Sequence, residues 1–465
     1  MKRILALIAI LAISLSISNA KNIKGTVTCN GRGVKGVIVT DGYGFTKTDI
    51  NGKYRLATAF DARFVYIVTP GRYTVDYSTG VPQFYKPIGN YDIYDFEINK
   101  SRNTDNYTLF SISDPQMKTR AHVNKFRGKP YRDLVSHGRK YARKGQMAAI
   151  MLGDIGWDSI DLTNDLYKDI VKNAGFPIYT VIGNHDHNYE KKGDRWAAED
   201  YEDSFGPSNY AFWIGKDLVI CLDNILYDTK KKYDEGYSEE VLSFLDGLLR
   251  LVPKGTHLYV AQHSPTYIWR KSEPYIIGAE KFLKLLDGYK VDILSGHTHF
   301  MNNIRHTPDI LEHNAASICG AWWETDWCRD GTPSGYEIFS NRRGKLAWFY
   351  HSLGYKDDFQ VEIIKPGESV LFPDAVIANV WDYDEEWTVE WYQDGVRMGE
   401  MERVKECSPT FRAQIAKYNE KHKDAKTFRN AVENDHYFKA VPQAGSAVTI
   451  VVKSRFGKEW KFDVQ

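Results

Sequence analysis

The chain has 465 residues, and its 61 basic and 60 acidic side chains leave a formal net charge of +1. That length is enough for several domains with sizeable cores. The balanced charge excludes the strongly basic surface of a nucleic-acid-binding protein and gives no reason to expect binding to anionic lipid. The five cysteines lack zinc-type spacing, so either Cys319 and Cys328 form a disulfide or the cysteines are small buried residues.

Residues 1–20 have the pattern of a secretory signal. Lys2 and Arg3 precede an apolar stretch from Ile4 to Leu11, and the small residues Ser18-Asn19-Ala20 suit a cleavage site. An uncleaved membrane anchor is the alternative, but a span needs about 20 consecutive apolar residues. We therefore expect an exported protein, periplasmic or secreted, with no membrane span after removal of the signal peptide.

Residues 21–104 are expected to form a small all-β sandwich. Short alternating runs such as Gly25–Thr28 and Arg63–Val68 are separated by turns, and Asp49–Tyr54 has the turn chemistry of a hairpin. No residues here have catalytic spacing, so we interpret this N-terminal domain as a packing or tethering module.

From residue 105 to 355, apolar runs alternate with amphipathic stretches, which predicts a layered α/β domain. Residues 356–465 return to β character and predict a β-rich C-terminal domain, with a structural or recognition role. Helices are expected at Tyr131–Lys144, Leu162–Asn173, Ser238–Leu249, Ala279–Leu286 and, in the C-terminal domain, near Phe411–His422.

Six apolar runs in the middle of the chain end at residue types that bind metals. Such runs suit strands buried on both faces, and ligands of open α/β sheets gather beyond the carboxyl ends of such strands. The residues that follow the runs should therefore converge on one rim and form a metal site, with enough donors for two metals. The runs are Tyr107–Ile112, Met147–Leu152, Ile178–Ile182, Leu218–Leu222, Leu258–Ala261 and Val291–Leu294.

The motifs at these ends are Asp114-Pro115-Gln116, Gly153-Asp154, Gly183-Asn184-His185-Asp186, the single His263, and Gly296-His297-Thr298-His299. Their order resembles the calcineurin-like metallophosphoesterase superfamily, and the flanking β regions resemble the accessory domains of its bacterial exported members. The resemblance implies a layered metallophosphoesterase-type β-sandwich flanked by helices for residues 105–355. Gln116 departs from the family pattern, in which the first motif is usually Asp-x-His.

The resemblance also implies the ligands of two divalent or trivalent metal ions, which would be Mn, Fe, Zn or Mg. Asp154 would bridge the ions at about 3.5–4 Å. A hydroxide that bridges the metals would attack phosphorus, while His185 assists the leaving group or the transition state and Asp186 orients the His185 ring. The remaining ligands would be Asp114, Gln116 and His299 for one metal, and Asn184, His263 and His297 for the other.

Gln116 leaves an alternative open. An amide oxygen is a neutral and weaker ligand than imidazole, so the first metal should bind less tightly and favour iron, manganese or magnesium. If Gln116 does not ligate, the site would be mononuclear or inactive.

Three groups near the motifs are candidates for contacting the substrate. The first follows His263 and forms either a lid that stacks on a base or sugar and pairs with a phosphate, or a folded surface loop. The second follows His299 and could contact phosphoryl oxygens. The third forms either a sugar or nucleobase platform or a hydrophobic plug against the C-terminal domain. The residues are Tyr267, Trp269 and Arg270 in the first group, Asn303 and Arg305 in the second, and Trp322 and Trp323 in the third.

The sequence therefore predicts a metal-dependent phosphoesterase that hydrolyses a phosphate mono- or diester. The near-neutral charge favours a small organic substrate over a long polyanion. The alternative is a catalytically weak or inactive protein that retains the fold and binds phosphate or glycan, and a third possibility is a structural assembly protein. The motifs do not distinguish monoesters from diesters, and they do not define the native metals or the oligomeric state.

Overall fold

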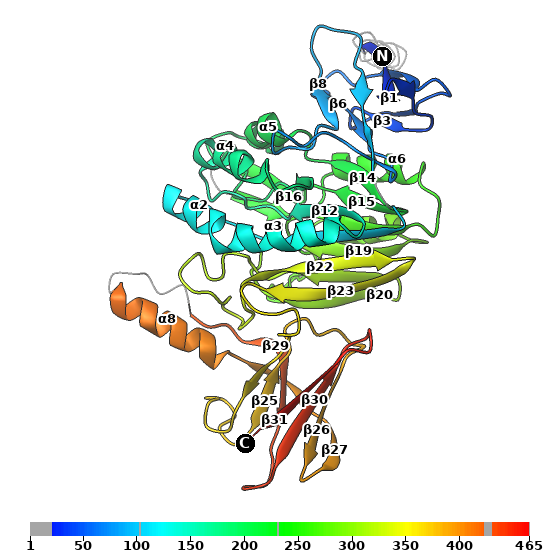
Figure 1. Cartoon of the computed structure of the whole chain (residues 1–465). Helices are drawn as coiled ribbons and strands as arrows, with labels where there is room; N and C mark the ends of the chain where they lie inside the picture. The colour runs from blue at the N-terminus through cyan, green and yellow to red at the C-terminus, as the bar shows by residue number, and fades with distance from the viewer. Residues whose placement is uncertain (1–20, 102–103, 230–231, 423–429, 465) are drawn as a thin grey trace, which may run out of the picture.

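The computed structural model describes residues 21–101, 104–229, 232–422 and 430–464, and Figure 1 shows their arrangement. The predicted signal peptide, residues 1–20, lies outside these ranges. Within them, no helix is both long enough and apolar enough to cross a membrane. All five cysteines lie in the described ranges, where each is buried with a free thiol. The structure therefore supports small buried cysteines and not a Cys319–Cys328 disulfide.

The N-terminal region is built from short strands. They are β1 (Asn22–Cys29), β2 (Arg32–Gly33), β3 (Ile38–Thr40), β4 (Phe45–Lys47), β5 (Lys53–Ala57), β6 (Phe64–Val68), β7 (Tyr73–Thr74), β8 (Tyr85–Pro87), β9 (Phe96–Glu97) and β10 (Asn99–Lys100). Two small sheets have the orders β2-β1-β5, with β9 beside β1, and β4-β3-β6-β8. Every residue of β6 is buried, and Arg63 beside it forms ion pairs with Glu202 and Asp203 of the central region, each at 2.5 Å. The N-terminal region is therefore fastened to the central one.

Two large sheets form the core of the central region. Their strands are β11 (Asn106–Ile112), β12 (Gln146–Met151), β13 (Ile178–Thr180), β14 (Tyr210–Ile214), β15 (Asp217–Cys221), β18 (His257–Ala261), β19 (Lys290–Ser295), β20 (Asn302–Thr307), β21 (Ile310–Asn314), β22 (Gly335–Arg342) and β23 (Lys345–Ser352). One sheet has the order β13-β12-β11-β22-β23 and the other β14-β15-β18-β19-β21-β20. The six predicted runs are all strands, and β11–β13 run parallel, as do β15, β18, β19 and β21. Their carboxyl ends therefore meet at one rim.

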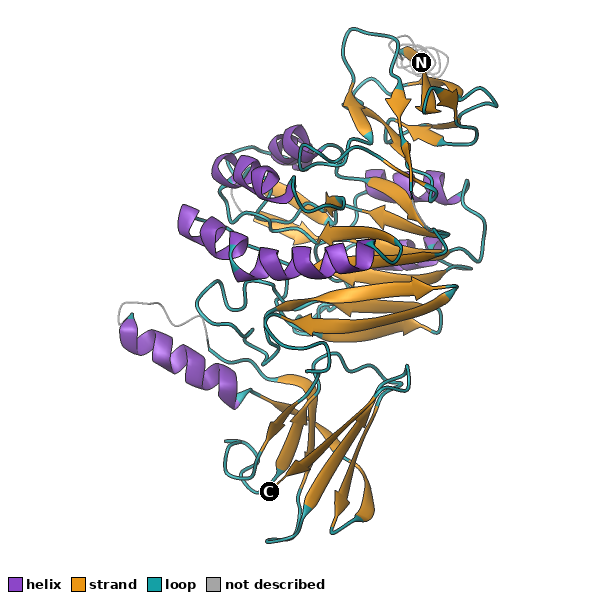
Figure 2. Ribbon diagram, viewed as in Figure 1, coloured by secondary structure: helices purple, strands orange, loops and turns teal. Residues whose placement is uncertain are grey.

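Helices cover the outer faces of these sheets (Figure 2). They are α2 (Arg120–Arg127), α3 (Lys129–Ala142), α4 (Ile160–Val171), α5 (Asp194–Phe205), α6 (Glu239–Leu249) and α7 (Ala279–Leu285). On β11, Leu109 belongs to the core shared with the second sheet, whereas the ring centroid of Phe110 lies 5.8 Å from that of Tyr141 on α3. This burial on both faces explains the unbroken apolar sequence of the strand. Helices α2 and α5 were not predicted; α2 buries only Val123 and Phe126, too few apolar positions for a clear helical period.

The C-terminal region is a second, smaller pair of sheets with one helix. Its elements are β24 (Glu362–Ile364), β25 (Val376–Asn379), β26 (Thr388–Gln393), β27 (Val396–Glu400), β28 (Glu402–Glu406), α8 (Pro409–Lys421), β29 (Asn434–Ala440), β30 (Val448–Lys453) and β31 (Glu459–Val464). The sheet orders are β24-β25-β29-β28 and β27-β26-β30-β31. The predicted helix is α8, and its Phe411 and Ile415 pack in one cluster with Trp327 and Trp381. This cluster joins the C-terminal region to the central one.

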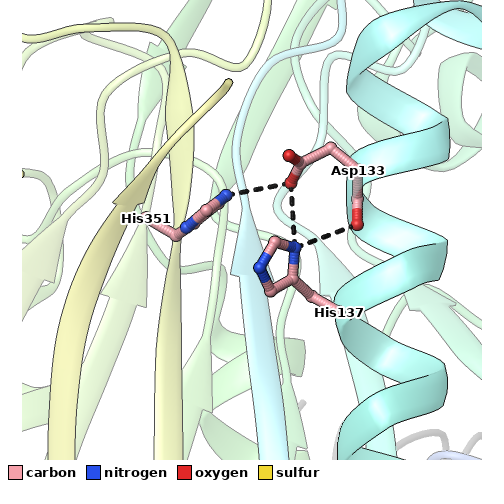
Figure 3. A group of neighbouring side chains, drawn as sticks. All are labelled: Asp133, His137 and His351. Carbon is pink, nitrogen blue, oxygen red and sulfur yellow. Dashed lines mark hydrogen bonds and ion pairs between the residues drawn. The ribbon is translucent and has the colours of Figure 1, made fainter. Parts of the chain in front are cut away.

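A group of charged side chains holds α3 against β23 (Figure 3). His351 Nε2 lies 3.0 Å from Asp133 Oδ1, and His351 Nδ1 lies 2.8 Å from Asp357 Oδ1. His137 Nδ1 lies 3.1 Å from the backbone carbonyl oxygen of Asp133 and 3.2 Å from its carboxylate. These residue types can hold metals, but the two carboxylates already account for both ring nitrogens of His351. We interpret Asp133, His137, His351 and Asp357 as an ion-pair clamp.

The clamp should make stability depend on pH. Burial lowers the pKa of His351, but hydrogen bonds to Asp133 and Asp357 outweigh burial and raise the pKa to about 9. Since the folded-state pKa lies above the unfolded value, the stabilisation is fully present below about pH 6.5 and is lost as the pH rises through about 9. We predict that His351→Gln lowers the free energy of unfolding by about 3 kcal/mol at about pH 6. The loss should shrink toward about pH 9 in urea denaturation, following the same titration.

His122→Gln on α2 is the matched control, because His122 pairs with no carboxylate in the described part of the chain. It should change the unfolding free energy little at any pH. If His351→Gln lowers the free energy of unfolding by the same amount at about pH 6 and at about pH 9, the clamp is contradicted.

Candidate metal centre

The seven predicted metal ligands lie together at the carboxyl ends of β11, β12 and β13 in one sheet and of β18 and β19 in the other. Six of the seven are buried, and His297 is half-buried. A continuous set of contacts links them, including a hydrogen bond from the backbone N–H of His297 to Asp114, although they span more than 180 residues of sequence. They are Asp114, Gln116, Asp154, Asn184, His263, His297 and His299.

One group of donors surrounds His263 Nε2. This nitrogen lies 3.0 Å from Asn184 Oδ1, 3.1 Å from His297 Nδ1 and 3.3 Å from Asp154 Oδ1. A single proton on Nε2 can satisfy only one of these lone pairs. A cation at the centre would satisfy all four donors, and carboxylate, amide oxygen and imidazole are the donor types that borderline divalent metals accept. Asp154, His263 and His297 also lie close enough together to ligate one ion.

A second group lies on the other side of Asp154. Gln116 Nε2 donates a hydrogen bond to Asp154 Oδ2 at 2.9 Å, and His299 Nε2 lies 3.4 Å from Asp114 Oδ1. Three buried polar atoms here have no hydrogen-bond partner among the described residues: Asp114 Oδ1, Gln116 Oε1 and His299 Nδ1. An unsatisfied buried polar atom costs about 1–3 kcal/mol. These donors therefore fit a cation, and Asp154 offers one carboxylate oxygen to each group.

The electrostatic field at the site favours a positive charge. Burial raises the pKa of Asp154, but His263 and His185 outweigh it and hold the carboxyl pKa well below its usual range. Burial likewise opposes ionisation of Asp114, and His299 and His263 lower its pKa. Burial lowers the pKa of His263, yet the carboxylates of Asp154 and Asp114 raise it to about 10. The ionised carboxylates therefore attract a cation to this point.

The backbone at the site is strained. The φ angles of Asp114, Gln116, Asp154, His297 and His299 are 53°, 40°, 50°, 67° and 58°. Residues other than glycine rarely adopt this left-handed backbone conformation. Each one that does lowers the stability of the fold by about 1–3 kcal/mol. Strain of this kind concentrates at functional sites, where the surrounding structure holds it in place. Five of the seven donors share it.

Glycines allow the donor loops to approach one another. A Cβ on Gly183 would lie 2.3 Å from Asp154 Oδ1, and a Cβ on Gly296 would lie 2.7 Å from Asp114 Oδ2. Any side chain at either position would therefore displace a carboxylate. This explains the Gly that precedes the donors in two of the motifs.

Outer contacts fix the orientation of two imidazoles. His263 Nδ1 lies 2.7 Å from the backbone carbonyl oxygen of Leu152, so Nδ1 keeps its proton and Nε2 is the nitrogen that would give its lone pair to a bound cation. His297 Nε2 lies 3.3 Å from Glu235 Oε1, and Glu235 also pairs with Lys271. Glu235 belongs to β17 (Lys232–Glu235), which pairs with β16 (Ile225–Thr229). Its role was not predicted, because no motif connects this hairpin to the ligand loops.

His185 lies beside the metal centre, but its ring partner differs from the predicted one. Its backbone N–H donates to Asp154 Oδ1 at 2.9 Å, and its Nδ1 lies 2.8 Å from Asp158 Oδ1. The prediction that Asp186 orients the ring is wrong. The Asp186 carboxylate accepts hydrogen bonds from the backbone N–H groups of Gly183, Ile155 and Gly156, so it shapes the loops instead.

The pKa values of His185 and Asp186 are both raised, but for different reasons. Burial lowers the pKa of His185, and Asp154 and Asp158 raise it, with a net upward shift. Burial and the nearby Asp154 carboxylate raise the pKa of Asp186 to about 7. Asp158 was missed because a single Asp four residues after Asp154 carries no motif of its own.

Asn303 and Arg305 do not point to the site. Asn303 Nδ2 donates to Asp382 Oδ1 at 3.1 Å and to the carbonyl of Tyr383 at 3.2 Å. Arg305 forms an ion pair with Glu386 at 3.5 Å. Both residues lie on β20, the edge strand that faces the C-terminal region, so the prediction that they contact phosphoryl oxygens is wrong.

The two predicted tryptophans take different places. The ring centroid of Trp322 lies 5.1 Å from that of His299 and 6.4 Å from that of Trp157. The ring of Trp157 in turn lies 5.8 Å from that of His185. Trp323 Nε1 donates to the carbonyl of Pro115 at 2.9 Å and thereby supports the first ligand loop. Trp322 and Trp157 therefore stand beside the donors, and the plug against the C-terminal region is Trp327.

The first candidate group, in the segment after His263, is partly accessible. Tyr267 packs against Tyr275 with 5.0 Å between ring centroids, which is typical of a folded loop. Trp269 is half-buried, and Arg270 is exposed with its guanidinium over the Trp269 ring at 5.5 Å.

The sequence of the chain is similar to those of known proteins. Models of calcineurin-like phosphoesterase sequences match three consecutive parts of the chain: the N-terminal part over residues 21–101, the phosphoesterase itself over 107–301 and the C-terminal part over 312–460. A probable glycerophosphodiester phosphodiesterase of Arcobacter nitrofigilis is 27% identical over 205 residues, which are 43% of this chain and 68% of the relative.

Solved structures show weaker likeness. GAP50, the anchor in the inner membrane complex of Plasmodium, has 15% identity and a TM-score of 0.34 over 54% of this chain and 89% of its own. A 5′-nucleotidase from Candida albicans has 11% identity and a TM-score of 0.33 over 54% of this chain and 52% of its own. Likenesses of this size carry no information on the substrate. From the three family matches, the chain belongs to the calcineurin-like phosphoesterase family, and the reaction class that this membership supports is metal-dependent hydrolysis of a phosphate ester.

Proposed function

We propose that the seven donors hold two metal ions bridged by Asp154, and that the protein hydrolyses a phosphate mono- or diester of a small organic substrate. The observation that carries the proposal is the position of Asp154, whose two oxygens face separate groups of donors. Bound divalent ions would make a water molecule nucleophilic at neutral pH and offset the charge of the phosphoryl oxygens. The protein orients the donor side chains, and the two sheets bury the site from below.

His185 is proposed to assist the leaving group or the transition state. Its Nδ1 is engaged by Asp158 at 2.8 Å, which fixes the ring and leaves Nε2 for a substrate oxygen. Its side chain is 25% exposed, so a substrate can reach it, unlike the fully buried His263. Asp158 acts as the positioning residue.

Gln116 is proposed to ligate through Oε1, the atom that has no hydrogen-bond partner in the described structure. Its amide N–H already donates to Asp154, so the carbonyl oxygen is the atom left for a metal. A neutral oxygen at this position favours a harder metal such as manganese, iron or magnesium.

Phosphodiesters are the first substrates to test, because the Arcobacter nitrofigilis relative is named for one. Metal analysis and a screen of phosphodiesters and monoesters with Mn²⁺, Mg²⁺, Zn²⁺ and Fe²⁺ separate the proposal from its alternative. We expect close to two equivalents of metal and turnover that disappears with a chelator, with both metals lost in Asp154→Ala. Phosphate binding with one or no metal and no turnover would instead support the inactive, phosphate- or glycan-binding protein.

His185→Ala should separate catalysis from metal binding. We predict a fall in kcat of about 10²-fold or more, because a positioned acid contributes about 10²–10⁴-fold. Metal content measured by atomic emission should stay near that of the parent protein, since the His185 side chain is not a proposed ligand. Asp158→Asn should cause a smaller fall in kcat and also keep the metal. A loss of metal in His185→Ala as large as the loss of turnover would contradict this division of roles.

We also propose that the protein acts outside the cytoplasm after removal of residues 1–20, on the basis of the signal pattern. N-terminal sequencing of the protein isolated from its host should begin near Lys21. A mature chain that begins at Met1 in the cytoplasmic fraction would contradict export.

A further inference from the structure

Three cationic side chains gather beside the metal centre. Arg270 lies over the rings of Trp269 and Phe300, at 5.5 and 5.2 Å from the ring centroids. Arg329 lies 5.8 Å from the centroid of the Trp322 ring. We name Arg270, Arg329 and Lys405 the cationic rim.

Lys405 brings the C-terminal region into this group. It lies on β28, and its Nζ is 5.2 Å from the centroid of the Trp269 ring, the ring that Arg270 also covers. Two regions of the chain therefore place positive charge around one aromatic side chain.

No carboxylate in the described part of the chain forms an ion pair with the cationic rim. Within the described residues, none of its three members forms an ion pair, whereas Arg127, Arg195, Arg250 and Arg305 of the central region each do. Asp330 follows Arg329 directly in the sequence, but it is buried. Its carboxylate already accepts a hydrogen bond from the backbone N–H of Met301 and pairs with His436. Among the described residues, the Arg329 guanidinium donates one hydrogen bond, from Nε to the carbonyl of Asn430 at 2.8 Å.

The two arginines also repel each other. Burial lowers the pKa of Arg329, and the neighbouring charge of Arg270 lowers it further, against a smaller opposing effect of Asp330. Like charges that are held together without a counterion indicate a place where an anion binds. Both guanidinium groups are backed by aromatic rings, which restricts their motion and prepares them for planar contacts with phosphate or carboxylate oxygens.

A short set of contacts connects the cationic rim to the donors. Arg329 covers Trp322, the Trp322 ring lies 5.1 Å from His299, and Phe300 under Arg270 follows His299 directly. A molecule whose phosphate lies at the metal centre can therefore reach the rim with another part of its structure. Trp322 between the two sites offers a flat apolar surface for that intervening part.

We propose that the cationic rim is a second anion site, and that it selects phosphate esters that carry a further anionic group several atoms from the scissile phosphate. The proposal rests on the proposed function, because it places the reacting phosphate at the metal centre. It assigns the C-terminal region a direct contact with substrate through Lys405.

The test compares two chromogenic esters that differ by one anionic group: thymidine 5′-(p-nitrophenyl phosphate) and the same ester with a 3′-phosphate. We expect the parent protein to hydrolyse the 3′-phosphorylated ester with a kcat/KM at least about 10-fold higher, the effect of one charge-assisted contact. Arg270→Gln and Arg329→Gln should each bring the ratio of the two kcat/KM values toward one. Arg343→Gln is the matched control, because Arg343 lies at the opposite end of β22 from the site and should leave the ratio unchanged.

Isothermal titration with thymidine 3′,5′-bisphosphate and thymidine 5′-monophosphate separates this proposal from the proposed function. Tighter binding of the bisphosphate, lost in Arg270→Gln, supports the second anion site even if neither ester is hydrolysed. Equal affinities for the two nucleotides in the parent protein would overturn it, and so would a preference that survives both arginine substitutions. Arg270 is exposed, and its contacts among the described residues are with the rings of Trp269 and Phe300, so its variant tests the charge without breaking a hydrogen bond of the fold.

Discussion

The structure depends on one carboxylate being shared between two groups of buried donors. Asp154 lies at the end of β12 in one sheet, and its oxygens face His263 from the other sheet and Gln116 from the neighbouring loop. Placing so many lone pairs in a buried space is unfavourable unless a positive charge joins them. The fold therefore has to hold the two sheets in fixed relation, because a small slip would separate the donors. Their common core and the long parallel strands meet that requirement.

The same constraint explains the strained loops. Each donor must turn back from the end of a strand within a few residues, and a left-handed residue reverses the chain in the shortest distance. The glycines at 183 and 296 then allow neighbouring loops to touch. The stability lost to backbone strain in the donor loops is offset elsewhere, in the sheets and in contacts such as the α3–β23 clamp.

Local patterns were enough to predict the strands and the donor set. A strand buried on both faces is recognisable from its unbroken apolar run, and its end determines where the next polar side chain lies, as at Asp114 and Asp154. Partners that come from distant segments could not be predicted. Asn303 faces Asp382, and His185 pairs with Asp158 and not with the adjacent Asp186. Helix α5 was missed because its sequence is rich in acidic residues and its apolar stripe is narrow.

The tryptophan-rich loop shows why the substrate-facing residues were the hardest to predict. Trp322 and Trp327 have the same side chain and lie five residues apart, yet one contacts His299 and the other packs on Trp381 in the C-terminal region. The difference comes from the C-terminal region, which buries Trp327 and so fixes the loop that presents Trp322. A region with no catalytic motif thus determines the shape of the wall beside the metal centre. The motifs of the central region therefore define the reaction class, whereas the wall beside them depends on packing with a second folded region.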